Sequence, residues 1–411
     1  MKLWKKCTMA GALVLAGGSL YLSPKITALK AIQQFFDEPQ IVENFRNTNR
    51  FWPSKPLLAS SAPKPYLENL SLSLPDQFTY NGKNFATPTF LEDSWSTGLL
   101  VVQNNILVYE EYFLGNSIGA RNISWSMAKS FISALIGIAI DEGKIASIEE
   151  PVDQYAPQLA TSGYRGVRIK DVLQMSSGVE FNEDYGDYYS DINRWGRDFA
   201  LGNSQDAFAA SLQRGVPPGT LNHYVSIDTH VLSMVLARAT GRSITDYTQE
   251  KLYQPMGMEY PGYWLVDGKN VEMALGGLNL TLRDFAKLGS LYLHNGQVNG
   301  RQVVPQDWID ASLTPDANHL MPGDNFGYGF QWWIPAGDSG EFFALGVYNQ
   351  YIYINRKTRT VIAKLSANPH FNDPDYAPAS DQVHIALFRA IANKAAVAEQ
   401  NKIVNKDFGE S

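Results

Sequence analysis

Apolar segments separated by polar turns predict β-strands near both ends of the chain. Residues 99–102 and 106–109 are apolar and stand on either side of a polar turn, which is typical of two antiparallel strands. Residues 342–354 and 360–366 are rich in β-branched and aromatic side chains and also enclose a polar turn. The predicted strands therefore come from segments that are far apart in the sequence.

Between these strands, apolar residues recur every three or four positions, which is the spacing of amphipathic helices. One such helix begins at Ser126, carries Phe131, Leu135 and Ile138 on one face, and ends at Gly143. Further helices are predicted at residues 29–50, 167–175, 227–240, 281–294 and 381–399. Strands at both ends with helices between them predict an α+β fold, in which an antiparallel sheet flanked by helices carries an inserted all-helical region.

The first residues differ in character from the body of the chain. A basic start precedes an apolar run at residues 9–22, which is the pattern of a secretory signal and is shorter than the ~20 residues of a membrane-spanning helix. No small-residue cleavage site follows, so cleavage is left open, and we expect an exported protein that is periplasmic or anchored facing the periplasm. The predicted segments are a signal peptide or N-terminal membrane anchor (1–28), helices and a Pro-rich linker (29–75), a main domain (76–395) and a C-terminal tail (396–411).

Composition excludes several classes of function. The chain has 411 residues, a net charge of −7 and scattered Lys and Arg, so it lacks the basic patch of a nucleic-acid-binding protein. Its one cysteine, Cys7, lies ahead of the apolar run and permits no internal disulfide. The six histidines form no metal-binding motif, so we expect neither a metal nor another cofactor. An enzyme that acts on a small molecule fits these properties.

Three serines are candidates for the nucleophile of a hydrolase. Ser117 lies in a Gly-x-Ser-x-Gly motif, but no helix is predicted directly after it, and a Gly- and Asn-rich turn is the preferred interpretation. Ser61 is followed three residues later by a lysine, but Pro63 forbids the helix that would bring the two together.

Ser126 and Lys129 have the same spacing at the start of a predicted helix. There the amine lies beside the hydroxyl, and the unpaired N–H groups of the first helical turn are available to an oxyanion. Ser126 is therefore the predicted nucleophile. A surface serine and lysine that open an amphipathic helix would show the same pattern.

Residues 124–131 read Ser-Trp-Ser-Met-Ala-Lys-Ser-Phe and resemble the nucleophile segment of the serine β-lactamase and penicillin-recognising superfamily. The likeness is greatest to its class C-like branch of β-lactamase-related esterases and amidases, which includes the 6-aminohexanoate-dimer hydrolases. Further segments resemble family motifs in the family's order, at residues 170–178, 217–226, 276–278, 327–333 and 346–350. The resemblance covers roughly residues 75–395 and implies a β-lactamase/DD-peptidase-like fold.

The resemblance implies a catalytic role for several residues. Ser126 would attack the acyl carbon, while Lys129 and Tyr224 would share the proton transfers, with either the phenol oxygen or the amine as the base. A tyrosine with a pKa near 10 is a poor base unless a neighbouring ammonium favours its ionised form, and Lys129 would supply that charge. Ser226, two residues after Tyr224, would hydrogen-bond into this network.

The third motif of the superfamily is a Lys-Thr-Gly or His-x-Gly triplet, and here the triplet reads Ala344-Leu345-Gly346. Gly346 is retained and would let a substrate approach the strand. The N–H groups of Ser126 and Val347 would then hold the oxyanion. Because Ala344 carries no charge, the carboxylate of a β-lactam or of peptidoglycan loses its partner, and an uncharged ester or amide is favoured.

Two functions remain open at this point. The resemblance implies an exported serine hydrolase that cleaves a small-molecule ester or amide through an acyl-enzyme on Ser126, with no nucleic-acid partner and a membrane tether at the N-terminus if the signal is retained. The alternative is a non-catalytic protein that uses the penicillin-recognising fold for binding or for an envelope role. The intact Ser126, Lys129 and Tyr224 favour catalysis, whereas the missing cation at Ala344 is the basis of the alternative.

Overall fold

A computed structural model describes residue 27 and residues 30–323, 326–337, 339–373, 375 and 379–407. The predicted signal peptide or anchor lies outside the described residues, apart from Thr27. Among the described helices, none is long and apolar enough to cross a membrane.

An eight-stranded sheet forms the centre of the molecule, and its strands are antiparallel except for the last pair. In spatial order they are β12 (Gly327–Tyr328), β13 (Trp333–Ile334), β14 (Glu341–Gly346), β15 (Gln350–Asn355), β16 (Thr360–Ser366), β5 (Ser96–Gln103), β6 (Ile106–Tyr112) and β2 (Leu67–Glu68). Strand β16 from the C-terminal hairpin pairs with β5 from the N-terminal hairpin, so the distant apolar segments do join in one sheet.

Residues 342–354 were predicted as one strand, and this is wrong. Strands β14 and β15 pair with each other across a turn at residues 347–349, in which Tyr348 and Asn349 have φ angles of 65° and 64°. These left-handed conformations reverse the direction of the chain within a segment whose composition predicts one continuous strand.

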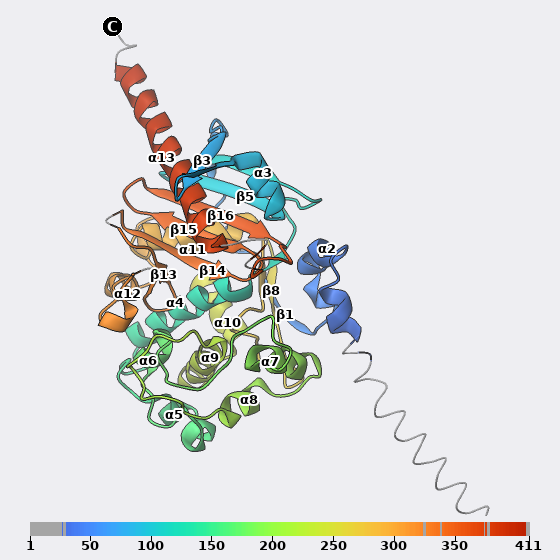
Figure 1. The fold of residues 1–411 in the computed structure, drawn as a ribbon. Coiled ribbons are helices and arrows are strands. Elements are labelled where there is room, and N and C mark those ends of the chain that lie inside the picture. Colours follow the sequence, from blue (N-terminus) through green and yellow to red (C-terminus); the bar gives the residue numbers. More distant parts are fainter. Residues whose placement is uncertain are drawn as a thin grey trace, which may run out of the picture.

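The sheet has an apolar core on each face because its side chains alternate. Leu100 and Val102 of β5 join the core beneath α4 (Ala128–Asp141) and α11 (Leu282–Leu293), while Leu99 and Val101 join the core beneath α13 (Ser380–Asp407). Figure 1 shows α13 along one face of the sheet, with α4 and α11 on the other side.

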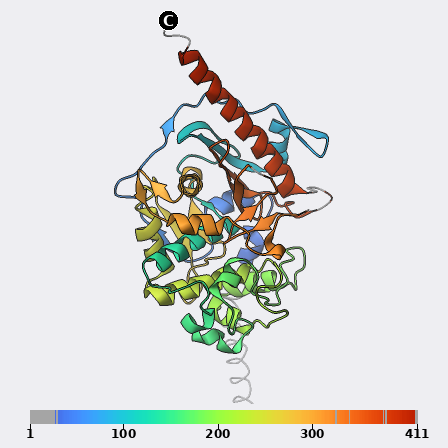
Figure 2. The same ribbon diagram turned by 90° about the vertical axis from the view of Figure 1, so that its left-hand side faces the viewer.

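The inserted helical region surrounds one buried helix. Helix α9 (Ser226–Thr240) is buried over most of its length, and it ends at Gly241 with a φ of 67°, a left-handed cap that glycine adopts without strain. Around it lie α5 (Val152–Tyr155), α6 (Ile169–Leu173), α7 (Asp191–Ala200), α8 (Gln205–Ser211) and α10 (Ile244–Thr248). Figure 2 shows this region, in green, as a layer below the sheet.

The N-terminal arm, residues 30–57, packs onto the body. Within it, α2 (Ile41–Arg46) follows a helical turn, and β1 (Ser54–Leu57) pairs with β8 (Gly262–Leu265) at the edge of a second antiparallel sheet. The other strands of that sheet are β9 (Leu278–Leu280) and β7 (Asn122–Ile123). In the buried contact between arm and body, the Thr48 hydroxyl donates to Asn279 Oδ1 at 2.8 Å.

The remaining elements are short. They are β3 (Gln77–Tyr80), β4 (Lys83–Ala86), α3 (Thr87–Asp93), β10 (Gln297–Val298), β11 (Arg301–Gln302) and α12 (Gln306–Ser312), together with the single turns η1 (Thr48–Arg50), η2 (Trp125–Met127), η3 (Pro157–Thr161), η4 (Gln249–Tyr253) and η5 (Asn318–Leu320).

Candidate active site

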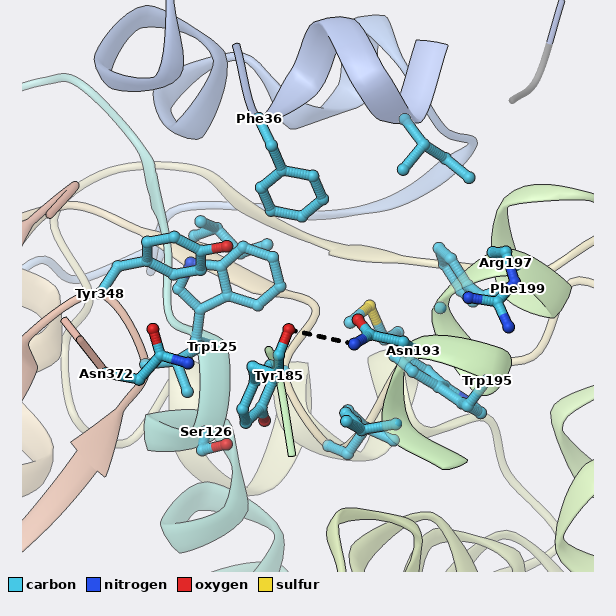
Figure 3. Close-up of a pocket in the computed structure, with 18 of the residues that line it drawn as sticks. Phe36, Trp125, Ser126, Tyr185, Asn193, Trp195, Arg197, Phe199, Tyr348 and Asn372 are labelled. Carbon is cyan, nitrogen blue, oxygen red and sulfur yellow. Dashed lines mark hydrogen bonds between the residues drawn. The ribbon is translucent and has the colours of Figure 1, made fainter. Parts of the chain in front are cut away.

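Ser126 lies in the tight turn η2, which leads directly into α4. Trp125, just before it, has a φ of 45°, a left-handed conformation that costs a non-glycine residue roughly 1–3 kcal/mol. Such strain persists only where the surroundings fix the backbone, and it is concentrated at functional sites. Here it presents Ser126 to a pocket at the start of a helix (Figure 3).

Strand β14 passes close to this turn. A Cβ atom at Gly346 would lie 2.6 Å from the Ser124 carbonyl oxygen and 3.2 Å from the Ser126 nitrogen, so a larger residue would push the strand away. Val347, the next residue, lines the same pocket as Ser126. The structure thus brings together the residues that were predicted to form the oxyanion site.

Lys129 lies one turn along α4 and is buried, with 1% of its surface exposed. Its Nζ donates to the Leu275 carbonyl oxygen at 2.9 Å and to Ser226 Oγ at 3.3 Å. Burial lowers the pKa of Lys129 to about 7, and the negative charges of Glu183 and Asp228 partly oppose this shift. Near pH 7 a substantial fraction of the amine is therefore neutral.

Tyr224 reaches Ser126 from the loop before α9. Its phenol lies close enough to Ser126 for that side chain to lower the pKa of the phenol, its ring stacks on Trp333 with centroids 5.4 Å apart, and Lys129 Nζ lies 5.5 Å from the ring centroid. Burial, followed by the charge of Glu183, raises the pKa of the phenol. Of the two groups left open as the base, the amine is therefore the one whose pKa lies near neutrality.

Glu183 is a site residue that the sequence did not single out. It comes from the polar loop of residues 182–191, where its Oε2 accepts the N–H of Ser226 at 2.9 Å and its Oε1 accepts the Ser226 hydroxyl. Tyr185 donates to the same carboxylate at 2.8 Å. A carboxylate at the first residue of α9 satisfies a free N–H and interacts favourably with the helix dipole. No local pattern distinguishes Glu183 from its neighbour Asp184.

Asp228 is the second unpredicted acid. It is fully buried on α9, and its Oδ1 accepts the Tyr164 hydroxyl at 2.7 Å. Burial raises the pKa of Asp228 to about 8, although hydrogen bonds from Tyr164 and Ser177 and the charge of Lys129 act in the opposite direction. An aspartate inside an apolar helix is unusual, and that signal could have marked it in the sequence.

Ser117 and several other polar residues lie outside this cluster or make other contacts. In the described chain no helix follows Ser117 directly, so the nucleophile-elbow geometry is absent. His223 binds the Phe181 carbonyl oxygen through Nε2 at 2.8 Å, and Ser190 caps α7. Ala344 lies on β14 and is buried. Within the described residues, no group of three His, Cys, Asp or Glu side chains could hold a metal ion.

Ser126 opens onto a pocket of about 550 Å³ with largely aromatic walls (Figure 3). The walls come from five distant parts of the chain: the N-terminal arm, residues 123–126, helix α7 with the loop before it, residues 265–276, and the β14–β15 turn with the segment near residue 371. The aromatic rings are those of Phe36, Trp52, Trp125, Tyr185, Tyr188, Trp195, Phe199, Tyr348 and Phe371.

Comparison with known proteins places this site in a family. The family model described as Beta-lactamase matches residues 97–385. The chain belongs to the beta-lactamase family. Both the superfamily resemblance and the fold class predicted from the sequence are thereby confirmed, since solved structures of β-lactamase and penicillin-binding-protein type share the fold.

Two relatives within this β-lactamase family carry the name 6-aminohexanoate-dimer hydrolase. The sequence is 29% identical to that hydrolase from Paenarthrobacter ureafaciens over 299 residues, which cover 69% of this chain and 75% of the relative. A Bacillus anthracis protein assigned to the same activity has a solved structure with a TM-score of 0.77 and 24% identity, covering 89% of this chain and 96% of that one.

A more distant structure is EstCE1, a hydrolase with promiscuous acyltransferase activity. It matches with a TM-score of 0.58 and 13% identity over 73% of this chain and 96% of its own. At these identities the structures establish the shared fold. The family, with a named hydrolase among its sequence relatives, supports hydrolase activity.

Proposed function

We propose that this β-lactamase-family protein is a serine hydrolase that cleaves an ester or amide bond of a small molecule through a covalent acyl-enzyme on Ser126. The observation that carries the proposal is the environment of that hydroxyl. It lies close enough to the phenol of Tyr224 to influence the pKa of that phenol, and the amine of Lys129 is buried near the Tyr224 ring with a pKa of about 7. A base that titrates near the working pH is suited to proton transfer.

The hydrogen bonds of Lys129 support its role as the base. A neutral amine has two N–H groups and one lone pair. Bonds to the Leu275 carbonyl and to Ser226 Oγ use two N–H groups, so the lone pair remains free to accept a proton. The carboxylate of Glu183 fixes Ser226 in turn and holds this arrangement in place.

The proposed reaction has two stages. Ser126 Oγ bonds to the acyl carbon while its proton passes through the Tyr224 phenol to Lys129, and the N–H groups of Ser126 and Val347 stabilise the oxyanion. The bond to the leaving alcohol or amine then breaks, and the leaving group takes the proton back through Tyr224. Water next attacks the acyl carbon and gives up its proton along the same route to Lys129. The bond between the acyl carbon and Ser126 Oγ then breaks, Oγ takes this proton back, and the acid is released.

Two observations support esters and amides over β-lactams. Ala344 stands on β14 where the superfamily's third motif would supply a cation for the carboxylate that β-lactams carry, and it provides none. The named sequence relative acts on the 6-aminohexanoate dimer, whose two units are joined by an amide. The dimer is therefore the first amide to test, together with p-nitrophenyl esters.

A fluorophosphonate probe tests the nucleophile. We expect the probe to label the full-length protein, and we expect Ser126→Ala to abolish both the labelling and the hydrolysis of p-nitrophenyl acetate. Ser117→Ala is the matched control and should retain both. No labelling of the folded protein, or labelling that survives Ser126→Ala, would support the non-catalytic alternative. Rapid acylation by penicillin would contradict the preference for esters and amides.

Export also remains a proposal, supported by the basic and apolar start of the sequence. A fusion of residues 1–28 to a reporter that is active only outside the cytoplasm should give activity. Mass spectrometry of the mature N-terminus would show whether the segment is cleaved, and an inactive fusion would contradict export.

A further inference from the structure

Arg197 is the one charged side chain among the described residues that line the active-site pocket. It lies on α7, across the pocket from Ser126 (Figure 3). The lining between them is aromatic or aliphatic for the most part, and Trp125, Trp195 and Phe199 are among its members. The pocket therefore has a nucleophile at one end, a cation at the other, and an apolar passage between them.

The guanidinium of Arg197 is held in place without being neutralised. Its Nη1 donates to the Tyr188 carbonyl oxygen at 2.7 Å, and its Cζ lies 4.0 Å from the centroid of the Tyr188 ring. Within the described residues it has no carboxylate partner. Arg194, one turn earlier on α7, differs in this respect because it pairs with Asp191 at 2.7 Å.

A fixed and unneutralised guanidinium is well suited to bind a carboxylate. It carries five N–H donors in a planar fork that can hold both oxygens of a carboxylate at once. Stacking on Tyr188 also reduces the conformational freedom that the side chain would lose on binding. An apolar passage of this kind would desolvate the connecting part of the ligand and strengthen the ion pair at its end.

The position of the charge determines which anions fit. Ala344 on β14 is uncharged, and none of the described pocket-lining residues around Ser126 provides a cation for a carboxylate next to the scissile bond. Arg197 provides a cation for a carboxylate that is separated from the scissile bond by an apolar chain. The pocket thus distinguishes remote from adjacent carboxylates.

We propose that the pocket binds esters or amides in which an apolar chain connects the scissile carbonyl to a terminal carboxylate, and that Arg197 binds this carboxylate as a specificity-determining residue. The inference rests on the proposed hydrolase function and specifies its substrate class.

A pair of esters that differ only in the terminal group tests the proposal. The mono-p-nitrophenyl ester of suberic acid carries a carboxylate at the end of its chain, and p-nitrophenyl octanoate carries a methyl group there. We expect wild-type kcat/KM to favour the suberate ester. Arg197→Gln should lower the ratio of the two kcat/KM values about 10- to 100-fold, the range expected for lost hydrogen bonds to a charged group.

Two further variants control for folding and for general charge. Arg194→Gln removes a cation from the same helix outside the pocket and should leave the ratio unchanged. Arg197→Glu should reverse the preference, so that an ester ending in trimethylammonium becomes the better substrate. Equal kcat/KM losses on both esters in Arg197→Gln, or an unchanged ratio, would overturn the proposal.

A binding measurement separates this inference from the hydrolase proposal. Calorimetry with the monoamide of suberic acid and the Ser126→Ala variant requires no turnover, and we expect binding that Arg197→Gln weakens at least tenfold. If wild type hydrolyses no ester while this binding persists, the hydrolase proposal fails and the anion site stands. If wild type hydrolyses both esters and binding is independent of Arg197, the anion site is overturned.

Discussion

At the scale of single residues, the proposed chemistry depends on an amine that the fold removes from water. Lys129 has no carboxylate within ion-pair distance among the described residues, and its polar contacts are a carbonyl oxygen and a hydroxyl. Burial therefore dominates its pKa, while Glu183 and Asp228 act on it through space. The pKa of the proposed base is thus set by its surroundings as a whole.

The pH profile should reflect this balance. We expect kcat/KM for p-nitrophenyl acetate to rise with pH through an apparent pKa near 7, because the neutral amine is the base. The negative charge of Glu183 raises the pKa of Lys129, so Glu183→Gln should move the rising limb to lower pH. Asp184→Asn, an exposed acid on the same loop, should leave the limb in place. A shift to higher pH in Glu183→Gln would contradict this assignment.

Gly346 permits a second test at this scale. A methyl group there would lie 2.6 Å from the Ser124 carbonyl oxygen, so Gly346→Ala must displace β14 and with it the N–H of Val347. We expect kcat to fall by about 100-fold or more, as when an oxyanion donor is lost. At Gly119 the nearest atom to an added Cβ is 3.5 Å away, and Gly119→Ala should retain activity. Stopped-flow measurement of the acylation rate would compare Gly346→Ala and Gly119→Ala with the wild type.

At the scale of elements, the N-terminal arm is part of the pocket. Phe36 lies nearly parallel to Trp125 and Tyr348, with ring centroids 6.1 Å and 6.0 Å away, and these rings belong to three separate segments (Figure 3). The arm is held by the pairing of β1 with β8 and by buried aromatic rings around Phe35. The position of Phe36 over the pocket therefore depends on an element that lies outside the region matched by the family model.

Phe36→Ala should weaken substrate binding more than catalysis. Its ring is partly exposed to the pocket, and aromatic contacts contribute about 0.5–1.5 kcal/mol beyond the area that they bury. We expect KM for p-nitrophenyl octanoate to rise about 3- to 10-fold while kcat for p-nitrophenyl acetate changes little. Leu58→Ala, an exposed position just after β1, is the control. An unchanged KM in Phe36→Ala would show that the arm has only a structural role.

At the scale of the whole molecule, the sheet separates the catalytic core from a second core that holds a buried lysine. Lys364 on β16 is fully buried near α13, where it donates to the Ser366 hydroxyl. Burial also lowers the pKa of Lys364 well below its ordinary value. The lysine is therefore neutral in the folded protein at a pH where the unfolded chain would protonate it.

This difference predicts a pH-dependent stability. Between the folded-state pKa of Lys364 and its unfolded value of about 10.5, the unfolded chain binds one more proton, so stability falls as pH decreases through that window. Lys364→Met should raise Tm by a few degrees at pH 7, and the gain should shrink toward pH 10. Lys83 is exposed, so Lys83→Met should shift Tm equally at both pH values. If Lys364→Met raised Tm by the same amount at pH 7 and pH 10, this result would contradict a neutral Lys364 in the folded protein.

Part of the site was predictable because its signals are local. The spacing of Ser126 and Lys129, the helix that follows them, and the order of motifs up to Gly346 are all properties of short segments. Helical periodicity and turn composition likewise located α4, α9 and α11 to within a few residues. The split of 342–354 into two strands was missed because composition does not reveal that Tyr348 and Asn349 adopt left-handed conformations.

The sequence by itself determined the beta-lactamase-family fold, the candidate nucleophile and the absence of a cation at Ala344. Only the tertiary structure decided which groups surround that nucleophile. Glu183 and Arg197 resemble many other charged residues in the sequence, and they acquire a role because distant segments bring them to α9 and to the pocket. The tertiary structure also decided the pKa of Lys129. Desolvation of the amine depends on every element packed around it, and no single segment of the chain determines it.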